Sequence, residues 1–331
     1  MPPQANYQSP YLYDFTHISG RGMGIRANHY LRRGSRIITD TPLFTIPNYT
    51  TDPAAVTSHV TKALKGKSKD EQRMFLSLFN AYPQDYMPFY GIIKTNSLPL
   101  GPDSEDAGLF LTCARLNHSC APNANHTWNS ETGKETVHAI RDILRGEEVT
   151  ICYLGSDKAC KDRAGRRKEL ATVFKFECRC PVCTLPPEQS LESDKRRAEI
   201  ERLDGIIGQE NVLMLEASMA LDCCRTMLKL MDQERIYDKR VARTYYDAFQ
   251  ICIANGDAAR ASVFARRSVQ ERMVCEGPDA AGLEEHRRFI ENPQSHRLFG
   301  LSDKWQTKIE DIRDHQDQEE FNVWLWKRAD G

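Results

Sequence analysis

The spacing of apolar residues changes in kind several times along the chain. Up to about residue 47, short apolar stretches end at turn residues such as Gly34 and Pro47, a pattern typical of strands. Apolar residues then recur every three or four positions in two segments, and again beyond about residue 190, which predicts helices. The first two helices are expected at 54–64 and 70–79, and strands at 11–18, 43–46, 136–140 and 149–153. The whole pattern predicts an α+β protein with a helical C-terminal domain.

The C-terminal part carries clear local signals for where helices begin and end. Helical spacing runs over 213–231, 245–254 and 258–274. Between the last two segments, Gly256 can adopt the left-handed conformation that ends a helix, and Asp257 can cap the next one. The sequence therefore predicts an antiparallel helical hairpin, which resembles one tetratricopeptide-like unit.

The length of the chain indicates its number of domains, and its net charge indicates which partners it is expected to bind. A chain of 331 residues exceeds the usual size of one hydrophobic core, so we expect two domains, or one with a large appendage, and a boundary near Pro186. The 45 basic and 46 acidic residues nearly cancel, which leaves no overall field for nucleic acid or anionic membrane. The basic helix predicted over 160–174 is interpreted as a solvated face. Because the charge is balanced and no basic stripe is interleaved with aromatic residues, nucleic-acid binding is not expected.

The hydropathy of the chain and its N-terminal residues indicate the cellular compartment in which the protein is expected. No run of roughly 18 apolar residues occurs. The N-terminal residues lack the basic start and the apolar stretch of a signal peptide. These features predict a soluble protein of the cytoplasm, the nucleus or both, without a membrane partner. We expect it to be a monomer.

The eleven cysteines would then lie in a reducing compartment, where close spacing favours a metal site over disulfides. Three of them form a C-x-C-x-x-C loop that could surround one ion: Cys178, Cys180 and Cys183. A closed structural zinc site needs four ligands. Cys120 is the preferred fourth ligand, and Cys152 and Cys160 are its competitors.

A polar segment in the middle of the chain is the main candidate for a functional loop. Residues 115–123 place an amide, an imidazole, a hydroxyl and a thiol side by side, and Pro122 stops any helix there. From spacing alone, His118 in this loop is more often a structural hydrogen-bonding residue, and Tyr153 a core or surface residue. The glycines of residues 20–24 indicate a tight turn, because no helix or later acidic residue completes a dinucleotide-binding loop.

Four motifs occur in an informative order: Gly22-x-Gly24, residues 117–123, residues 146–148 leading to Tyr153, and the cysteine loop. Together they resemble the motifs of SET-domain lysine methyltransferases, most of all the SET and MYND domain (SMYD) proteins and similar fungal SET proteins. The MYND zinc finger is missing, and a cysteine-free helical insert takes its place. The resemblance implies a β-rich SET domain in two parts at 1–50 and 108–155, a helical insert at 51–107, a post-SET zinc region at 156–186 and a helical, tetratricopeptide-like domain at 187–331.

The resemblance also implies a pseudoknot, formed by the central loop and the strand that ends at Tyr153, and it implies two bound groups, S-adenosylmethionine and a structural zinc ion. Tyr153 would supply the essential hydroxyl at the site of methyl transfer, and Phe176 would stack on the adenine. The glycine turn would let the backbone approach the cofactor. The implied cofactor-binding residues are Arg21, Gly22, Met23, Gly24, Asn117, His118, Tyr153 and Phe176.

The implied reaction is direct transfer of a methyl group from a sulfonium to the neutral amine of a protein lysine. The lysine must lose a proton first, since its ordinary pKa is about 10.4. Relatives commonly have a tyrosine at the position of Phe174, a substrate-pocket residue, and the lost hydroxyl predicts di- or trimethylation here. Two alternatives stay open: an enzyme of the same fold that acts on a small metabolite, and a non-catalytic module that binds a peptide.

Overall fold

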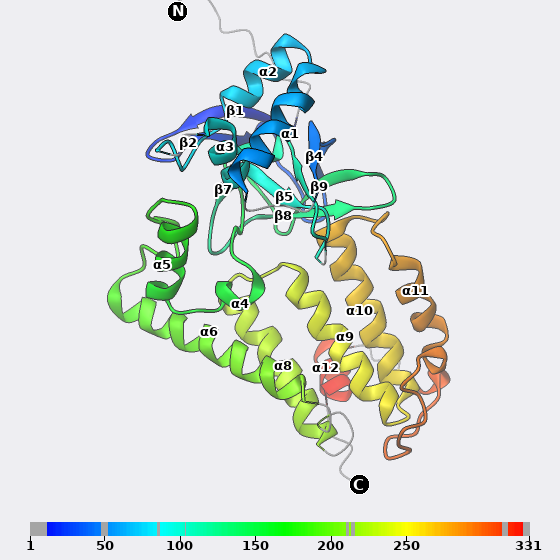
Figure 1. Ribbon diagram of the computed structural model, residues 1–331. Coiled ribbons are helices and arrows are strands. Elements are labelled where there is room, and N and C mark those ends of the chain that lie inside the picture. The colour runs from blue at the N-terminus through cyan, green and yellow to red at the C-terminus, as the bar shows by residue number, and fades with distance from the viewer. Residues whose placement is uncertain are drawn as a thin grey trace, which may run out of the picture. The chain divides into compact units, whose positions relative to one another are not determined.

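The computed structural model describes residues 12–47, 52–84, 87–102, 104–209, 212, 216–312 and 317–326 (Figure 1). The chain divides into two compact units. The first unit holds Met1–Tyr153, Arg167–Pro181 and Val274–Gly277, and the second holds Leu154–Arg166, Val182–Met273 and Pro278–Gly331. Strands and a small group of helices build the first unit and helices build the second, so the predicted α+β class is confirmed.

Three small sheets form the first unit. Their strands are β1 (Tyr13–Ile18), β2 (Gly22–Ala27), β3 (Arg36–Asp40), β4 (Phe44–Ile46), β5 (Ser97–Pro99), β6 (Ala107–Leu109), β7 (Asn117–His118), β8 (Ala124–Asn129), β9 (Lys134–Ala139) and β10 (Glu148–Ile151). The strand orders are β1-β2-β10-β7, β3-β9-β8 and β4-β6-β5. The first predicted strand begins at Tyr13, and residue 11 lies outside the described residues.

Alternation along the strands builds the core of this unit. Ile25, Val137, Val149 and Ile151 are buried in one apolar cluster, and Leu116 joins them from the central loop. Strand β10 begins after a turn in which Gly146 has φ 86°, a conformation that favours glycine. The strands that flank the candidate loop are therefore fixed by ordinary hydrophobic burial.

The helical insert consists of α1 (Pro53–Lys65), α2 (Lys69–Leu76) and α3 (Pro88–Asn96). Asp52 caps α1, and Ser68 with Glu71 forms a capping box at α2. Buried residues of these helices pack on those of β4 and β6, among them Phe75 and Leu109. The insert therefore shares a second apolar core with the sheet of β4, β6 and β5.

The end of α2 differs from the prediction. Apolar spacing extends to residue 79, but the helix ends at Leu76. The guanidinium of Arg115 donates hydrogen bonds to the Ser77 carbonyl (3.1 Å) and to the Met74 carbonyl (3.3 Å). These two carbonyls therefore bond to the central loop at the point where the helix stops.

Helices make up most of the rest of the chain. They are α4 (Ser156–Ala159), α5 (Arg163–Val173), α6 (Pro187–Ile207), α8 (Ala217–Gln233), α9 (Lys239–Ala254), α10 (Ala258–Glu276), α11 (Leu283–Glu291) and α12 (Gln318–Trp326), with 3₁₀ turns at Cys113–Arg115, Pro293–Ser295 and Ile309–Asp311. The basic helix predicted from residue 160 begins at Arg163, because the Asp162 carboxylate accepts a hydrogen bond from the backbone N–H of Gly165 (2.7 Å). The helix predicted from residue 213 begins at Ala217, and residues 213–215 lie outside the described residues. The helix predicted over 245–254 begins earlier, at Lys239, and ends at Ala254 as predicted.

The predicted helical hairpin is confirmed. Gly256 has φ 81°, and the backbone N–H of Asp257 donates to the carbonyl of Cys252 (2.9 Å), which closes α9 in a left-handed cap. The Asp257 carboxylate then accepts the N–H of Arg260 (3.0 Å) and caps α10. The hydroxyl of Ser268 on α10 donates to the carbonyl of Ala242 on α9 (2.8 Å), so the two helices run antiparallel.

The carboxyl group of Asp247 on α9 should make the stability of the protein depend on pH. The pKa of its carboxyl is raised to about 6, mainly by burial; Arg243 opposes this shift and the nearby Asp204 adds to it. The folded state therefore binds this proton more tightly than the unfolded chain does, so stability is gained as pH falls through about 6. We expect Asp247→Asn to raise the free energy of unfolding at pH 8 by about 1–2 kcal/mol, with a much smaller gain at pH 4.

Urea unfolding of the parent and Asp247→Asn at both pH values measures this difference. The exposed Glu201 on α6 provides a control, and Glu201→Gln should change the free energy of unfolding little at either pH. An equal gain for Asp247→Asn at pH 4 and pH 8 would contradict the electrostatic explanation.

Candidate active site and metal centre

The central loop is held against β10 by both backbone and side chains. Strand β7 pairs in parallel with β10, which places Asn117 opposite Thr150 and His118 opposite Ile151. Buried Asn123 continues this contact: it accepts the N–H of Thr150 (2.8 Å) and donates to the carbonyl of Glu148 (2.8 Å). Segments about thirty residues apart in the sequence thus form one rigid site.

Glu148 joins the glycine turn to the central loop. Its carboxylate forms an ion pair with Arg21 (2.6 Å) and accepts a hydrogen bond from the Asn117 amide (2.8 Å). Arg21 also donates to the backbone carbonyl of His118. Glu148 is not among the site residues predicted from the sequence. Its position in the motif of residues 146–148 could have identified it.

Gly22 and Gly24 of the glycine turn have different surroundings. A Cβ on Gly22 would meet nothing within 4 Å, and its φ of 75° favours glycine. A Cβ on Gly24 would lie 2.7 Å from the Ile18 side chain and 2.8 Å from the amide nitrogen of Asn117. Gly22 therefore borders open space that a ligand could enter, whereas Gly24 is needed because Asn117 packs directly on the backbone.

Gly24→Ala should consequently disturb the position of Asn117. We expect overpacking to lower the free energy of unfolding by about 1–3 kcal/mol. The matched control is Gly205→Ala in helix α6, where an added Cβ would meet nothing within 4 Å. That change should raise stability by about 0.5–1 kcal/mol. Chemical denaturation measures both, and a Gly24→Ala protein as stable as the parent would refute the packing explanation.

Tyr153 lies among aromatic rings next to this network. Its ring centroid is 5.0 Å from that of Phe174, 5.3 Å from His118 and 6.2 Å from Phe176. Its hydroxyl donates a hydrogen bond to the carbonyl of Leu116 (2.5 Å). Burial raises the pKa of the Tyr153 hydroxyl well above its usual value, with Arg21 opposing, so the group is a neutral donor. The structure thus brings Tyr153, Phe174 and Phe176 together.

His118 uses both ring nitrogens and is almost completely buried, with 2% of its surface exposed. The backbone N–H of Tyr153 donates to its Nδ1 (3.0 Å). Its Nε2 lies 3.3 Å from the sulfur of Cys120. The side chain is a hydrogen-bonding residue, as its spacing indicated, and it faces the cysteine loop and Tyr153 at once.

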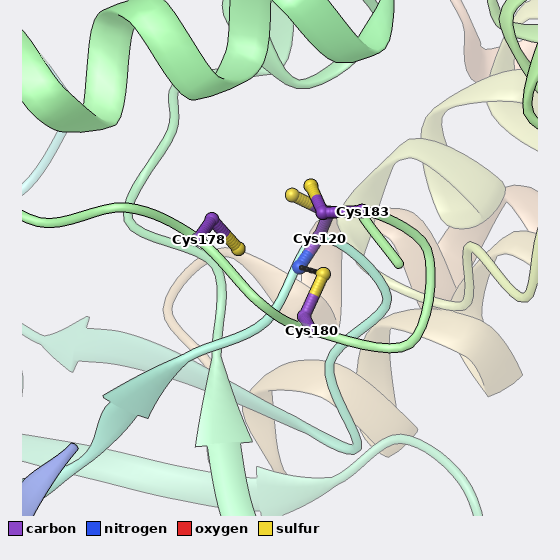
Figure 2. Close-up of side chains that lie close together, drawn as sticks. All are labelled: Cys120, Cys178, Cys180 and Cys183. Atoms are coloured by element: carbon purple, nitrogen blue, oxygen red, sulfur yellow. Dashed lines mark hydrogen bonds between the residues drawn. The ribbon is translucent and has the colours of Figure 1, made fainter. Parts of the chain in front are cut away.

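Four buried cysteines form the candidate metal centre (Figure 2). Their sulfur atoms all lie within 4.8 Å of one another: Cys120, Cys178, Cys180 and Cys183. Tetrahedral zinc with four thiolates at about 2.3 Å requires sulfurs about 3.8 Å apart, so the donor set and its spacing fit zinc. The backbone N–H of Cys120 also donates to the Cys180 sulfur (3.5 Å).

The structure distinguishes between the three candidates for the fourth ligand. Cys120 lies in the cluster, whereas Cys152 and Cys160 do not belong to it. The sulfur of Cys160 instead accepts a hydrogen bond from Arg240 (3.1 Å). Cys120 therefore completes a closed set of four thiols, which suits a structural ion better than a catalytic one.

Comparison with known proteins places the chain in a family. The sequence matches the SET domain over residues 22–154. It is 32% identical over 288 residues to the histone-lysine N-methyltransferase set5 of Schizosaccharomyces pombe, an alignment that covers 87% of this chain and 86% of that protein. The chain belongs to the SET-domain lysine methyltransferase family. The expected resemblance is confirmed.

Other SET-domain proteins match over shorter stretches. Mouse SMYD5, a protein-lysine N-trimethyltransferase, is 26% identical over 177 residues, or 38% of this chain and 42% of that protein. Among solved structures, the SET domain of LSMT bound to lysine and AdoHcy covers 97% of this chain and 95% of that one, with a TM-score of 0.33 and 10% identity. Because that score is low, the family assignment rests on the sequence matches.

Within the part of the chain that the structure describes, none of the helices combines the length and the apolar character needed to cross a bilayer.

Proposed function

We propose that the chain is an S-adenosylmethionine-dependent protein-lysine N-methyltransferase in which Tyr153 is the catalytic residue. The observation that carries this proposal is the hydroxyl of half-buried Tyr153, fixed on the Leu116 carbonyl beside the rings of Phe174 and Phe176. Family membership supports the activity, and the open space beside Gly22 fits a bound ligand at the glycine turn.

The cofactor supplies a methyl group on a positively charged sulfur, which is already a strong electrophile. The protein then has to bind, orient and exclude water. We assign Arg21, Gly22, Met23 and the central loop to cofactor binding. Asn117 is held by Glu148 through its amide nitrogen, so its carbonyl oxygen can accept a hydrogen bond from an ammonium group. Phe176 offers an aromatic face for the adenine.

Tyr153 is suited to the transfer point because it cannot ionise easily there. As a neutral donor bound to the Leu116 carbonyl, it holds one carbonyl and one hydroxyl oxygen together in an apolar surround. Such oxygens stabilise positive charge on a methyl group in transfer. The apolar surround also favours the neutral form of the amine, which is the nucleophile.

Phe174 bears on how many methyl groups are added. Its ring lies 5.0 Å from Tyr153 and has no hydroxyl to restrain a methylated amine. We expect the parent to form di- or trimethyllysine and Phe174→Tyr to shift the product toward monomethyllysine by at least about tenfold, since one hydrogen bond to a charged group contributes about 1.5–3 kcal/mol. Mass spectrometry of a methylated peptide measures this, and monomethyl product alone from the parent would overturn it.

The substrate is proposed to be a protein lysine, of a histone or of another protein. Its S. pombe relative is named as a histone-lysine methyltransferase, which favours a nuclear substrate, and a cytoplasmic one is the alternative. A small amine or metabolite would fit the same chemistry.

Radiolabelled S-adenosylmethionine, offered with a cell extract that is later split into protein and small-molecule fractions, tests the proposal. The parent should label a protein band, and Tyr153→Phe should not. Label confined to small molecules would favour the metabolite alternative. No label in either fraction, together with no cofactor binding in calorimetry, would favour a non-catalytic binding module.

A further inference from the structure

We propose that His118 is a positioning residue through which the four-cysteine centre controls the placement of Tyr153. This inference rests on the proposed function for the role of Tyr153, but its geometric content does not depend on activity. It connects the four-cysteine centre to Tyr153.

The hydrogen-bond pattern fixes the direction of the connection. A backbone N–H can only donate, so Nδ1 of His118 must be the acceptor for Tyr153 (3.0 Å). In the neutral ring the proton then lies on Nε2, which faces the Cys120 sulfur at 3.3 Å. His118 therefore donates to Cys120 and accepts from Tyr153.

The strength of the hydrogen bond from His118 to Cys120 depends on whether the four cysteines hold a metal ion. A metal ion binds Cys120 as a thiolate, and a thiolate accepts a hydrogen bond far better than a thiol does. Metal binding therefore strengthens the bond that orients the imidazole. Because His118 is 2% exposed, water cannot easily replace either partner.

Phe176 provides a second contact between the cysteine loop and Tyr153. Phe176 lies two residues before Cys178, and its ring centroid is 6.0 Å from His118 and 6.2 Å from Tyr153. The cysteine loop thus supports both His118 and Tyr153. The backbone of Tyr153 is fixed by His118, while its hydroxyl reaches the Leu116 carbonyl (2.5 Å), so a rotated imidazole would displace the hydroxyl.

Two isosteric substitutions separate the two hydrogen bonds. His118→Asn keeps an oxygen near the Nδ1 position and can still accept from Tyr153, but it has no atom that reaches Cys120. His118→Gln keeps an amide nitrogen near the Nε2 position and can still donate to Cys120, but it loses the acceptor.

The full chain, labelled with ¹⁵N-tyrosine and loaded with zinc or cadmium, reports the connection by NMR. Tyr153→Phe assigns the Tyr153 amide signal, and Tyr90 of the insert is the internal control. In the parent, exchange of zinc for cadmium should shift the Tyr153 amide and leave Tyr90 in place. In His118→Asn most of that shift should be lost, and metal affinity should fall by about 10–100-fold. In His118→Gln the Tyr153 amide should move even with zinc bound.

Activity provides a separate readout. His118→Gln should retain zinc affinity within about threefold while kcat falls by at least about tenfold, because it keeps the donor to Cys120 and loses the acceptor that positions Tyr153. A Tyr153 shift in His118→Asn equal to that of the parent would overturn the inference. Equal losses of metal and kcat in both variants would also overturn it, since they indicate a merely structural histidine. If the parent itself transfers no methyl, the proposed function fails, and the NMR and metal measurements still decide this inference.

Discussion

Tyr153→Phe should lower kcat for methyl transfer by about 10²–10³-fold, the range found when one preorganised hydrogen-bonding group is removed from a reaction site. The ring remains, so its contacts with Phe174 and Phe176 are kept, and the dissociation constant of S-adenosylmethionine should change little. The hydroxyl is lost from its position on the Leu116 carbonyl at 2.5 Å. That carbonyl is then left without this partner, which should lower the free energy of unfolding by about 1–3 kcal/mol.

Single-turnover assays and calorimetry measure the two quantities separately. Tyr30→Phe is a matched control, because the Tyr30 hydroxyl also makes a 2.5 Å hydrogen bond, to Asp142, but is exposed. It should leave kcat unchanged. If the kcat of Tyr153→Phe lies within a few fold of that of the parent, Tyr153 is not the catalytic residue. A parallel loss of cofactor affinity would instead assign it to binding.

Local sequence signals predicted much of the fold correctly. The hairpin of α9 and α10 depends on Gly256 and Asp257, whose effects act within a few residues. The four-cysteine centre is also mostly local, because three of its four sulfurs come from the six consecutive residues of the cysteine loop. Spacing and chemistry sufficed in both places because the interacting groups are near one another in the chain.

Other features were missed because they depend on segments far apart in the sequence. Glu148 acquires its role only when β10 lies beside β7 and the glycine turn, where it meets Arg21 and Asn117. At the end of α2, the Ser77 carbonyl accepts a hydrogen bond from Arg115, which lies 38 residues later in the chain. The dual hydrogen bonding of His118 requires Tyr153, 35 residues away. Neither periodicity nor residue type encodes such pairings.

Loss of the metal should have the widest effect on the proposed active site. In Cys178→Ser, one of four buried thiols is replaced by a hydroxyl, a poorer ligand for zinc than a thiolate. We expect most of the bound zinc to be lost in the presence of a chelator. We also expect S-adenosylmethionine affinity to fall by about two- to tenfold, since Phe176 is tied to the loop that the ion closes and a stacking contact contributes about 0.5–1.5 kcal/mol.

Metal analysis and calorimetry test this, with Cys223→Ser as the matched control. Cys223 on α8 is also buried, 6% exposed, but lies in the core of the second unit and outside the four-cysteine cluster. Its replacement should lower stability and leave zinc content and cofactor affinity unchanged. Because thiolates bind the ion and thiols do not, zinc should also be released from the parent as pH falls. Cofactor affinity that survives the loss of zinc in Cys178→Ser would show that the ion does not support this site. Affinity that declines together with zinc content would link the four cysteines to the place where Tyr153 acts.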